Sequence, residues 1–124
     1  KPMAKILGWA QHSQEPIWFT TAPAGALQNL MKKLGKDFKD FDLFEINEAF
    51  AVVSLACIKL LGIAEEGVNV NGGAVALGHP IGASGTRILI TLMHALKQRN
   101  LKRGAAAICL GGGEAVSLGI EILN

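Results

Sequence analysis

A histidine and a cysteine lie in two glycine-rich turns of this chain, each after an apolar run. His79 lies in GGAVALGHPIGASGTR at residues 72–87, and Cys109 opens the glycine cluster of AAAICLGGGE at residues 105–114. Turns that follow strands are where α/β proteins place their chemistry. A histidine can move a proton and a cysteine can act as a base or a nucleophile. The pair therefore indicates acyl chemistry.

Each of these residues also has a structural explanation. His79 could only hold its turn through hydrogen bonds to the backbone, and Cys109 could be an inert core residue. The three glycines after Cys109 favour a functional role, because they leave backbone N–H groups free to face an oxyanion. Asn47 could be the cap of an apolar helix, and Glu48 could complement the dipole of that helix.

The glycine clusters do not match nucleotide-binding motifs. Residues 73–78 have the GxxxxG spacing of a phosphate-binding loop, but His79 and Pro80 stand where a lysine and a hydroxyl residue are required. Residues 111–113 read GxG, and Val116 occupies the position of the third glycine of a dinucleotide fingerprint. We therefore expect neither a nucleotide nor a dinucleotide site.

Composition predicts one compact domain with a large docking surface. The chain has 124 residues, of which 50% are hydrophobic and 18% charged, with a formal net charge of +2. One domain of this size can bury a core without disulfides, and the apolar fraction exceeds what it usually hides. The nearly balanced charge argues against nucleic acid as a partner.

The two cysteines have neither the spacing of a disulfide framework nor that of a zinc site, so we expect no metal and a reducing compartment. The longest uncharged apolar stretch, residues 49–58, is too short to span a bilayer, which predicts a soluble protein without a membrane partner. The chain starts at Lys1 without a methionine, so we expect it to be part of a longer polypeptide. A cytoplasmic location is expected, with a mitochondrial or peroxisomal one left open.

The hydrophobic pattern predicts an α/β fold with the order β-α-β-α-β-α-β-β. This order implies a mixed five-stranded sheet with helices on both faces. The predicted strands cover residues 3–10, 41–46, 68–77, 105–110 and 116–122. The predicted helices start near residue 22 and end at Gly35, run from 49 to 61, and follow a turn at 78–85.

Two of these elements carry specific burial predictions. The helix at 49–61 has Lys59 as its only charge, so it should be buried on every side. The last strand alternates apolar residues from Val116 to Ile122 against Ser117, Gly119 and Glu121, which predicts that the apolar set is its covered face.

Three ordered motifs resemble the C-terminal half of a thiolase, and the resemblance runs through essentially the whole chain. They are NEAFA at 47–51, GGAVALGHPIGASG at 72–85 and CLGGGEAV at 109–116. Ketoacyl synthases share a GHxxGAxG turn, but they carry a histidine motif in place of Asn47 and Glu48 and lack a cysteine at the position of Cys109. The resemblance implies that residues 1–124 are a thiolase C-terminal domain without its N-terminal half.

The resemblance also implies a reaction. It is the Claisen condensation, or its reverse, between acetyl-CoA and a 3-ketoacyl-CoA such as acetoacetyl-CoA, with coenzyme A thioesters as substrates and no tightly bound cofactor. Cys109 would be the acid and base at the α-carbon, and His79 would activate a separate nucleophilic cysteine. Asn47 would hold a water that forms an oxyanion hole with His79, and the N–H of Gly111 would serve a second oxyanion hole.

By the same resemblance, Ala49 and Phe50 line the pantetheine tunnel. Neither Cys57 nor Cys109 lies in the motif of the family's nucleophilic cysteine, so the isolated chain is expected to be inactive. Its expected partners are the N-terminal thiolase half, against which the helix at 49–61 is expected to pack, and further copies of the full enzyme in a homodimer or homotetramer. The alternative from another class is a noncatalytic module that binds acyl-CoA or assembles a complex.

Overall fold

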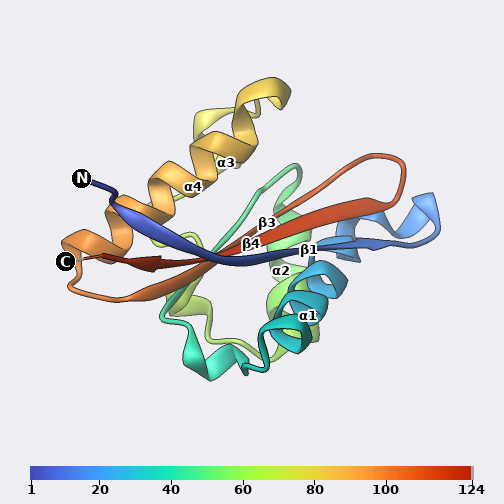
Figure 1. Cartoon of the computed structure of the whole chain (residues 1–124). Helices are drawn as coiled ribbons and strands as arrows, with labels where there is room; N and C mark the ends of the chain where they lie inside the picture. The colour runs from blue at the N-terminus through green and yellow to red at the C-terminus, as the bar shows by residue number, and fades with distance from the viewer. Residues whose placement is uncertain (124) are drawn as a thin grey trace.

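The protein is a mixed α/β sandwich built on a four-stranded sheet (Figure 1). The structure, a computed structural model, describes residues 1–123. The sheet has the order β1-β4-β3-β2, in which β2 pairs with β3 in parallel and the other two pairs are antiparallel. The strands are β1 (Ala4–Ser13), β2 (Leu43–Ile46), β3 (Arg103–Cys109) and β4 (Glu114–Ile122).

Helices cover both faces of this sheet, as the sequence predicted. α1 and α2 pack on one face and α4 on the other (Figure 1). The α-helices are α1 (Ala22–Leu34), α2 (Ala51–Leu61), α3 (Ala74–Leu77) and α4 (Ile81–Gln98). Short 3-10 turns are η1 (Pro16–Thr21), η2 (Phe38–Asp40) and η3 (Glu65–Gly67).

Glycines end α1 and α2 where the sequence predicted. Gly35 and Gly62 adopt the left-handed conformation, with φ of 61° and 62°. In this conformation their backbone N–H groups donate to carbonyls of the last helical turn, and glycine adopts it without a steric penalty. α4 begins earlier than predicted, at Ile81, because the helix continues through Gly82 and Gly85.

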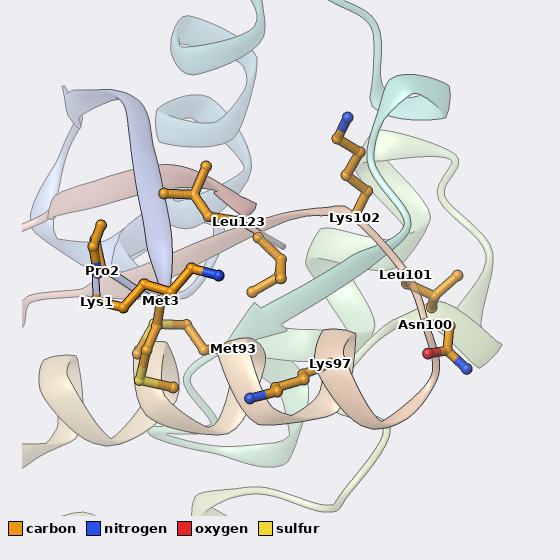
Figure 2. A pocket seen from close by; sticks show the side chains of 10 residues that line it. Lys1, Pro2, Met3, Met93, Lys97, Asn100, Leu101, Lys102 and Leu123 are labelled. Carbon is orange, nitrogen blue, oxygen red and sulfur yellow. The ribbon is translucent and has the colours of Figure 1, made fainter.

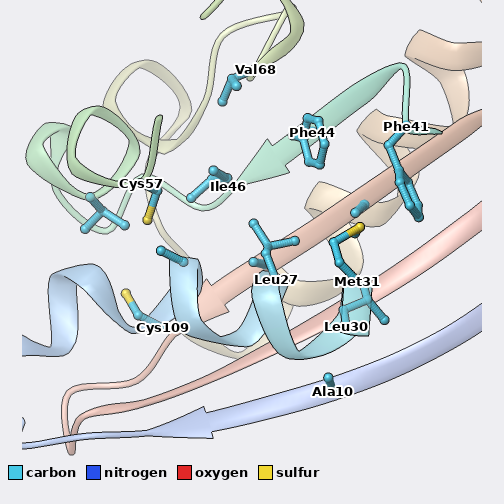
Figure 3. Close-up of a cluster of buried hydrophobic side chains, with 14 residues drawn as sticks. Ala10, Leu27, Leu30, Met31, Phe41, Phe44, Ile46, Cys57, Val68 and Cys109 are labelled. Atoms are coloured by element: carbon cyan, nitrogen blue, oxygen red, sulfur yellow. The ribbon is translucent and has the colours of Figure 1, made fainter. Parts of the chain in front are cut away.

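The core lies in two layers, one on each side of β3. Ala105, Ala107 and Cys109 belong to the layer formed with α1 and α2, in which Figure 3 labels Cys109. Ala106 belongs to the layer formed with α4. The alternation follows from the period of two along a strand. The small residues of β3 allow both helical layers to approach the sheet closely.

The prediction of a fifth strand at residues 68–77 is wrong. Within these residues Val68 forms only an isolated bridge with Phe44. Asn69 and Gly72 have positive φ values, 49° and 78°, which an extended strand cannot contain. The end of the segment is helical, as α3. The apolar alternation therefore belongs to a folded loop.

Within residues 1–123 the helix predicted at 49–61 is buried on one side only. Val53 and Cys57 of α2 are buried, but Val52, Leu55 and Leu60 on the other side are 52–60% exposed. Nothing among residues 1–123 covers that side. Across the part of the chain that the structure describes, no helix is both long and apolar enough to cross a membrane.

The burial of β4 differs from the predicted alternation. Ala115 and Ser117 are buried, and the hydroxyl of Ser117 donates to the Ala26 carbonyl of α1 at 2.8 Å. Val116, on the opposite face, is 43% exposed, while Ile120 on that face is buried with α4. The face of the apolar residues is covered only where α4 reaches it.

Leu92 tests the packing of α4 on the sheet. Leu92 is fully buried, and a Cβ added to Gly104 would lie 2.6 Å from its side chain. We expect Leu92→Ala to lower the free energy of unfolding by about 2–5 kcal/mol, since it leaves a cavity, as measured by urea unfolding. Ile90→Ala is the matched control, because Ile90 on the same helix is 46% exposed. Equal losses in the two variants would contradict the packing.

Candidate active site

Asn47 and Cys109 lie at the carboxyl ends of the two parallel strands. Asn47 directly follows β2, and its N–H donates to the Ala107 carbonyl of β3 at 2.9 Å. Cys109 ends β3 two residues further along. The carboxyl edge of parallel strands is where open α/β sheets bind ligands. Asn47 is fully buried and Cys109 is 8% exposed.

His79 reaches the same edge from the turn before α4. Gly78, with φ of 93°, and Pro80 flank it. His79 Nε2 lies 3.4 Å from Asn47 Nδ2. The tertiary structure thus brings together two predicted site residues that are 32 positions apart in the sequence.

The side chain of Asn47 faces this histidine and is not a helix cap. The N-cap of α2 is Phe50, and no side-chain hydrogen bond caps it. Asn47 Oδ1 instead accepts a hydrogen bond from Arg87 Nη2 at 3.4 Å. The explanation of Asn47 as a structural cap is therefore wrong.

Glu48 does not serve the dipole of α2 either. Its carboxylate accepts a hydrogen bond from the N–H of Val75 in α3 at 3.0 Å and one from Asn69 Nδ2 at 3.2 Å. A Cβ on Gly73 would lie 2.5 Å from this carboxylate, so a side chain there would displace it. Glu48 therefore ties the loop after β2 to the segment that leads to His79.

Asn69 holds that loop from the other side. Its Oδ1 accepts from the N–H of Ile46 at 2.8 Å, and its Nδ2 donates to the Ile46 carbonyl at 2.9 Å. The amide thus takes the place of a neighbouring strand at the end of β2. Nδ2 also lies 3.2 Å from Ser54 Oγ, which connects α2 to the same loop.

Cys57 and Cys109 are both buried, and neither forms a disulfide (Figure 3). Burial raises the pKa of Cys57 to about 11 and also raises the pKa of Cys109. Among residues 1–123 no hydrogen bond joins Cys109 to His79 or Asn47. Gly111 is exposed, and its N–H donates no backbone hydrogen bond in the described part of the chain, so it is available to a ligand.

A buried charge pair lies beside Asn47. Glu45 of β2 is 1% exposed, and its Oε2 lies 3.7 Å from Arg87 Nη1. Burial raises the pKa of Glu45 to about 7; Arg87 opposes this rise in pKa, and Glu48 adds to it. Glu45 Oε1 and Arg87 Nη1 have no hydrogen-bond partner among the described residues. Their charges are therefore only partly compensated.

The residues predicted to line a tunnel lie next to this site. Phe50 is 60% exposed, and its ring packs edge-on against Phe19 with 6.1 Å between centroids. Ala49 is half-buried against the core that contains α1 and α2. Their role in binding pantetheine stays a prediction.

A cavity of about 590 Å³ lies at the opposite end of α4 (Figure 2). Lys1, Lys97 and Lys102 line part of it, together with Met93 and Leu123. The helix rise of 1.5 Å per residue separates Lys97 from the start of α4 by about 24 Å. This cavity is remote from Asn47 and His79.

Sequence reasoning missed four residues that support the site: Glu45, Asn69, Ser84 and Arg87. A charged residue within the apolar strand FDLFEI was a usable signal for Glu45, because a buried charge requires a partner. Ser84 and Arg87 lie in the motif around His79, but the fold of α4 decides their contacts. Asn69 lies in the segment 68–77, whose apolar alternation predicts a strand.

A family model described as the thiolase C-terminal domain matches residues 1–122. The chain is 57% identical to a probable acetyl-CoA acetyltransferase of Dictyostelium discoideum, covering 99% of this chain and 30% of that protein. It is 50% identical to the cytosolic acetyl-CoA acetyltransferase of Mus musculus, covering 98% of this chain and 30% of that protein.

Solved structures give the same picture. The acetyl-CoA acetyltransferase of Bacillus anthracis matches with a TM-score of 0.96 and 46% identity, covering 99% of this chain and 31% of that one. A thiolase of Ascaris suum in complex with coenzyme A matches with a TM-score of 0.93 and 53% identity, covering 99% and 32%. The chain thus spans about 30% of the length of the relatives it matches.

Glu45 gives the first prediction from this site. Folding raises its pKa from an ordinary value of 4.5 to about 7. Between pH 4.5 and 7 the Glu45 carboxyl group is therefore protonated in the folded state and ionised in the unfolded state. The free energy of unfolding should therefore fall by roughly 3 kcal/mol as pH rises from 4.5 to 7. We expect Glu45→Gln to remove this fall, measured by urea unfolding at several pH values.

Glu66→Gln is the control for this experiment, because Glu66 is exposed and should keep the slope of the unsubstituted protein. A Glu45→Gln protein with that same slope would refute the raised pKa of Glu45.

The thiols give a second prediction. At neutral pH a thiol with a pKa of about 11 is about 0.01% thiolate, and only the thiolate reacts. We expect iodoacetamide at pH 7.5 to modify Cys57 at least tenfold more slowly than Cys109, because Cys109 is less buried. Mass spectrometry of the peptides measures both rates, and the protein unfolded in urea is the control. Faster modification of Cys57 would contradict the order.

Proposed function

This chain belongs to the thiolase family as a C-terminal domain, and on that premise we propose that it is the catalytic C-terminal half of an acetyl-CoA acetyltransferase. The observation that carries the proposal is the contact between His79 Nε2 and Asn47 Nδ2 at the sheet edge where β3 ends in Cys109. The names of the relatives support acetyl-CoA as a substrate. Coenzyme A in the Ascaris suum structure supports thioester substrates.

In the proposed reaction each residue has one task. His79 takes the proton of a nucleophilic cysteine supplied by the N-terminal half. The thiolate of that cysteine attacks the ketone carbon of acetoacetyl-CoA, and the bond to the α-carbon breaks. Cys109 then gives a proton to the acetyl-CoA carbanion. Coenzyme A accepts the acetyl group from the cysteine to complete thiolysis.

Three residues of this chain would stabilise the developing negative charges. Asn47 would hold a water that, with His79, donates to the enolate oxygen. The unpaired N–H of Gly111 would donate to the tetrahedral intermediate. Preorganised donors of this kind contribute about 3 kcal/mol each to catalysis. Ala49 and the exposed ring of Phe50 would contact the pantetheine arm.

The exposed apolar surface supports an N-terminal half as the partner. Val52, Leu55 and Leu60 of α2 are exposed. A second apolar area, a groove of about 330 Å³, lies between α4 and the sheet and includes Trp9 and Val116. Apolar areas of this kind mark interfaces. The length of the relatives leaves about 70% of a thiolase to supply the covering surface.

For the complete enzyme we propose a homodimer or homotetramer. We propose the cytoplasm as its location, because the similar mouse protein is named as cytosolic.

Coenzyme A-dependent thiolysis of acetoacetyl-CoA tests the proposal. We expect this chain alone to be inactive, because it lacks the nucleophilic cysteine. We expect activity once the chain is joined to the N-terminal half of the Dictyostelium discoideum relative, here called the hybrid enzyme. Within the hybrid enzyme, Cys109→Ala should lower kcat by about 10²–10⁴-fold, as the loss of a general acid and base does. The absorbance of the 3-ketoacyl thioester measures the rate.

Two controls make the result decisive. Cys57→Ala should keep the activity of the hybrid enzyme, since Cys57 is buried in the core. The relative's own two halves, joined at the same point, show that the junction permits activity. If that control is active and the hybrid enzyme is not, this chain is a noncatalytic module. Activity of the chain alone would refute the missing nucleophile.

A further inference from the structure

Asn47 and His79 are each held by a side chain of α4. His79 Nδ1 lies 2.6 Å from Ser84 Oγ, and Arg87 Nη2 donates to Asn47 Oδ1 at 3.4 Å. Ser84 and Arg87 are three residues apart, so they lie on the same side of the helix. Asn47 and Ser84 are fully buried. Four side chains thus form one continuous row of hydrogen bonds.

The Ser84 hydroxyl lies between the Pro80 carbonyl and the ring of His79. The hydroxyl of Ser84 donates to the Pro80 carbonyl at 3.1 Å, and a serine has only one proton to give. With its proton given to Pro80, Ser84 Oγ can accept a hydrogen bond from His79 Nδ1–H. In the neutral ring, the proton on Nδ1 leaves Nε2 with a free lone pair, which faces Asn47 Nδ2.

Arg87 fixes the orientation of the amide at the other end. An arginine only donates hydrogen bonds and keeps its charge in proteins. If the Asn47 amide were turned over, its NH₂ group would face Arg87 and its oxygen would face the lone pair of His79. Only the observed orientation matches every donor with an acceptor. Each group then donates to the next one: Arg87 to Asn47, Asn47 to His79, His79 to Ser84, and Ser84 to the Pro80 carbonyl.

Glu45 keeps Arg87 in place without competing for the same nitrogen. The carboxylate lies 3.7 Å from Nη1, whereas Asn47 receives its bond from Nη2. The side chain of Arg87 is 21% exposed and that of Glu45 is 2% exposed. The guanidinium therefore lies between one buried carboxyl group and one buried amide, which restricts its position.

We propose that Arg87 and Ser84 are positioning residues that keep His79 Nε2 as the free base and aim Asn47 Nδ2–H at it. The catalytic consequence rests on the proposed function. When Nε2 takes the proton of the nucleophilic cysteine, the Nε2–H and the Asn47 Nδ2–H both face the space between them. These two donors can then converge on one oxygen, directly or through a water. The distance of 3.4 Å between His79 Nε2 and Asn47 Nδ2 is long for a hydrogen bond, so moving the two groups apart costs little free energy.

The first test reads the ring of His79 directly. In the chain labelled with ¹⁵N-histidine, at a pH where the ring is neutral, we expect Nδ1 to carry the proton and Nε2 to give the signal of an unprotonated nitrogen. His79→Gln assigns the signals against those of His12 and His94. Ser84→Ala removes the acceptor of Nδ1–H, so the tautomer carrying the proton on Nε2 should become populated. A proton on Nε2 in the unsubstituted chain would overturn the proposal.

The second test reads the consequence in the hybrid enzyme. We expect Arg87→Met to lower kcat by about 10- to 100-fold, the effect of misplacing a catalytic group, with less than a twofold change in KM. Lys97→Met is the matched control, because Lys97 is an exposed cation on the same helix, and it should retain full activity. Arg87→Met with unchanged kcat would overturn the proposal.

These tests separate the inference from the proposed function. If the unsubstituted hybrid enzyme has no thiolysis activity while its junction control is active, the proposed function fails, and the tautomer of His79 still decides the hydrogen-bond assignment. If circular dichroism shows that the Arg87→Met variant is unfolded, the Ser84→Ala variant tests the proposal instead. Its kcat should fall while its KM and circular dichroism stay close to those of the unsubstituted enzyme. An unchanged kcat in Ser84→Ala would then overturn the proposal.

Discussion

The parallel pairing of β2 with β3 is the constraint on which the rest of the site depends. Four residues of each strand pair in register, from Leu43 with Gly104 to Ile46 with Ala107. The bond from the N–H of Asn47 to the Ala107 carbonyl extends this pairing to one of the proposed site residues. Because both strands run in the same direction, their carboxyl ends open on the same edge of the sheet. A shift of one residue would turn Glu45 into the other core layer.

Small residues in β3 make this pairing compatible with helices on both faces. The sequence GAAA at 104–107 has no side chain larger than a methyl group. Leu92 of α4 occupies the space that a side chain at Gly104 would need. Dense packing on both faces leaves little freedom to α4. The position of α4 in turn sets the positions of Ser84 and Arg87.

Glu45 and Arg87 place charged groups in an otherwise apolar layer, and their burial costs free energy. Burial of Glu45 raises its pKa to about 7, and two polar atoms of the Glu45–Arg87 pair lack hydrogen bonds in the described chain. A buried ion pair of this kind often stabilises a fold no better than apolar residues of the same size. Its contact with Asn47 through Arg87 therefore points to a role in orienting that side chain rather than in stability.

The sequence by itself determined the elements whose signals are local. The apolar spacing of α1, the glycines that end α1 and α2, and the small-residue strand β3 follow from helix period, left-handed caps and strand period, and all were predicted. The three motifs were sufficient to indicate the family. They also identified Asn47, His79 and Cys109 as site candidates, and the structure brings Asn47 and His79 into contact.

Only the tertiary structure decided which groups touch. The apolar alternation of residues 68–77 is typical of a strand, yet Asn69 supplies with one amide the bonds that a strand would make to Ile46. The exposed side of α2 and the half-covered face of β4 depend on which surfaces find a neighbour. The partners of Asn47 come from residues 32 and 40 positions away. No local pattern encodes such contacts, because the direction of a hydrogen bond is set by the donors and acceptors that folding places around it.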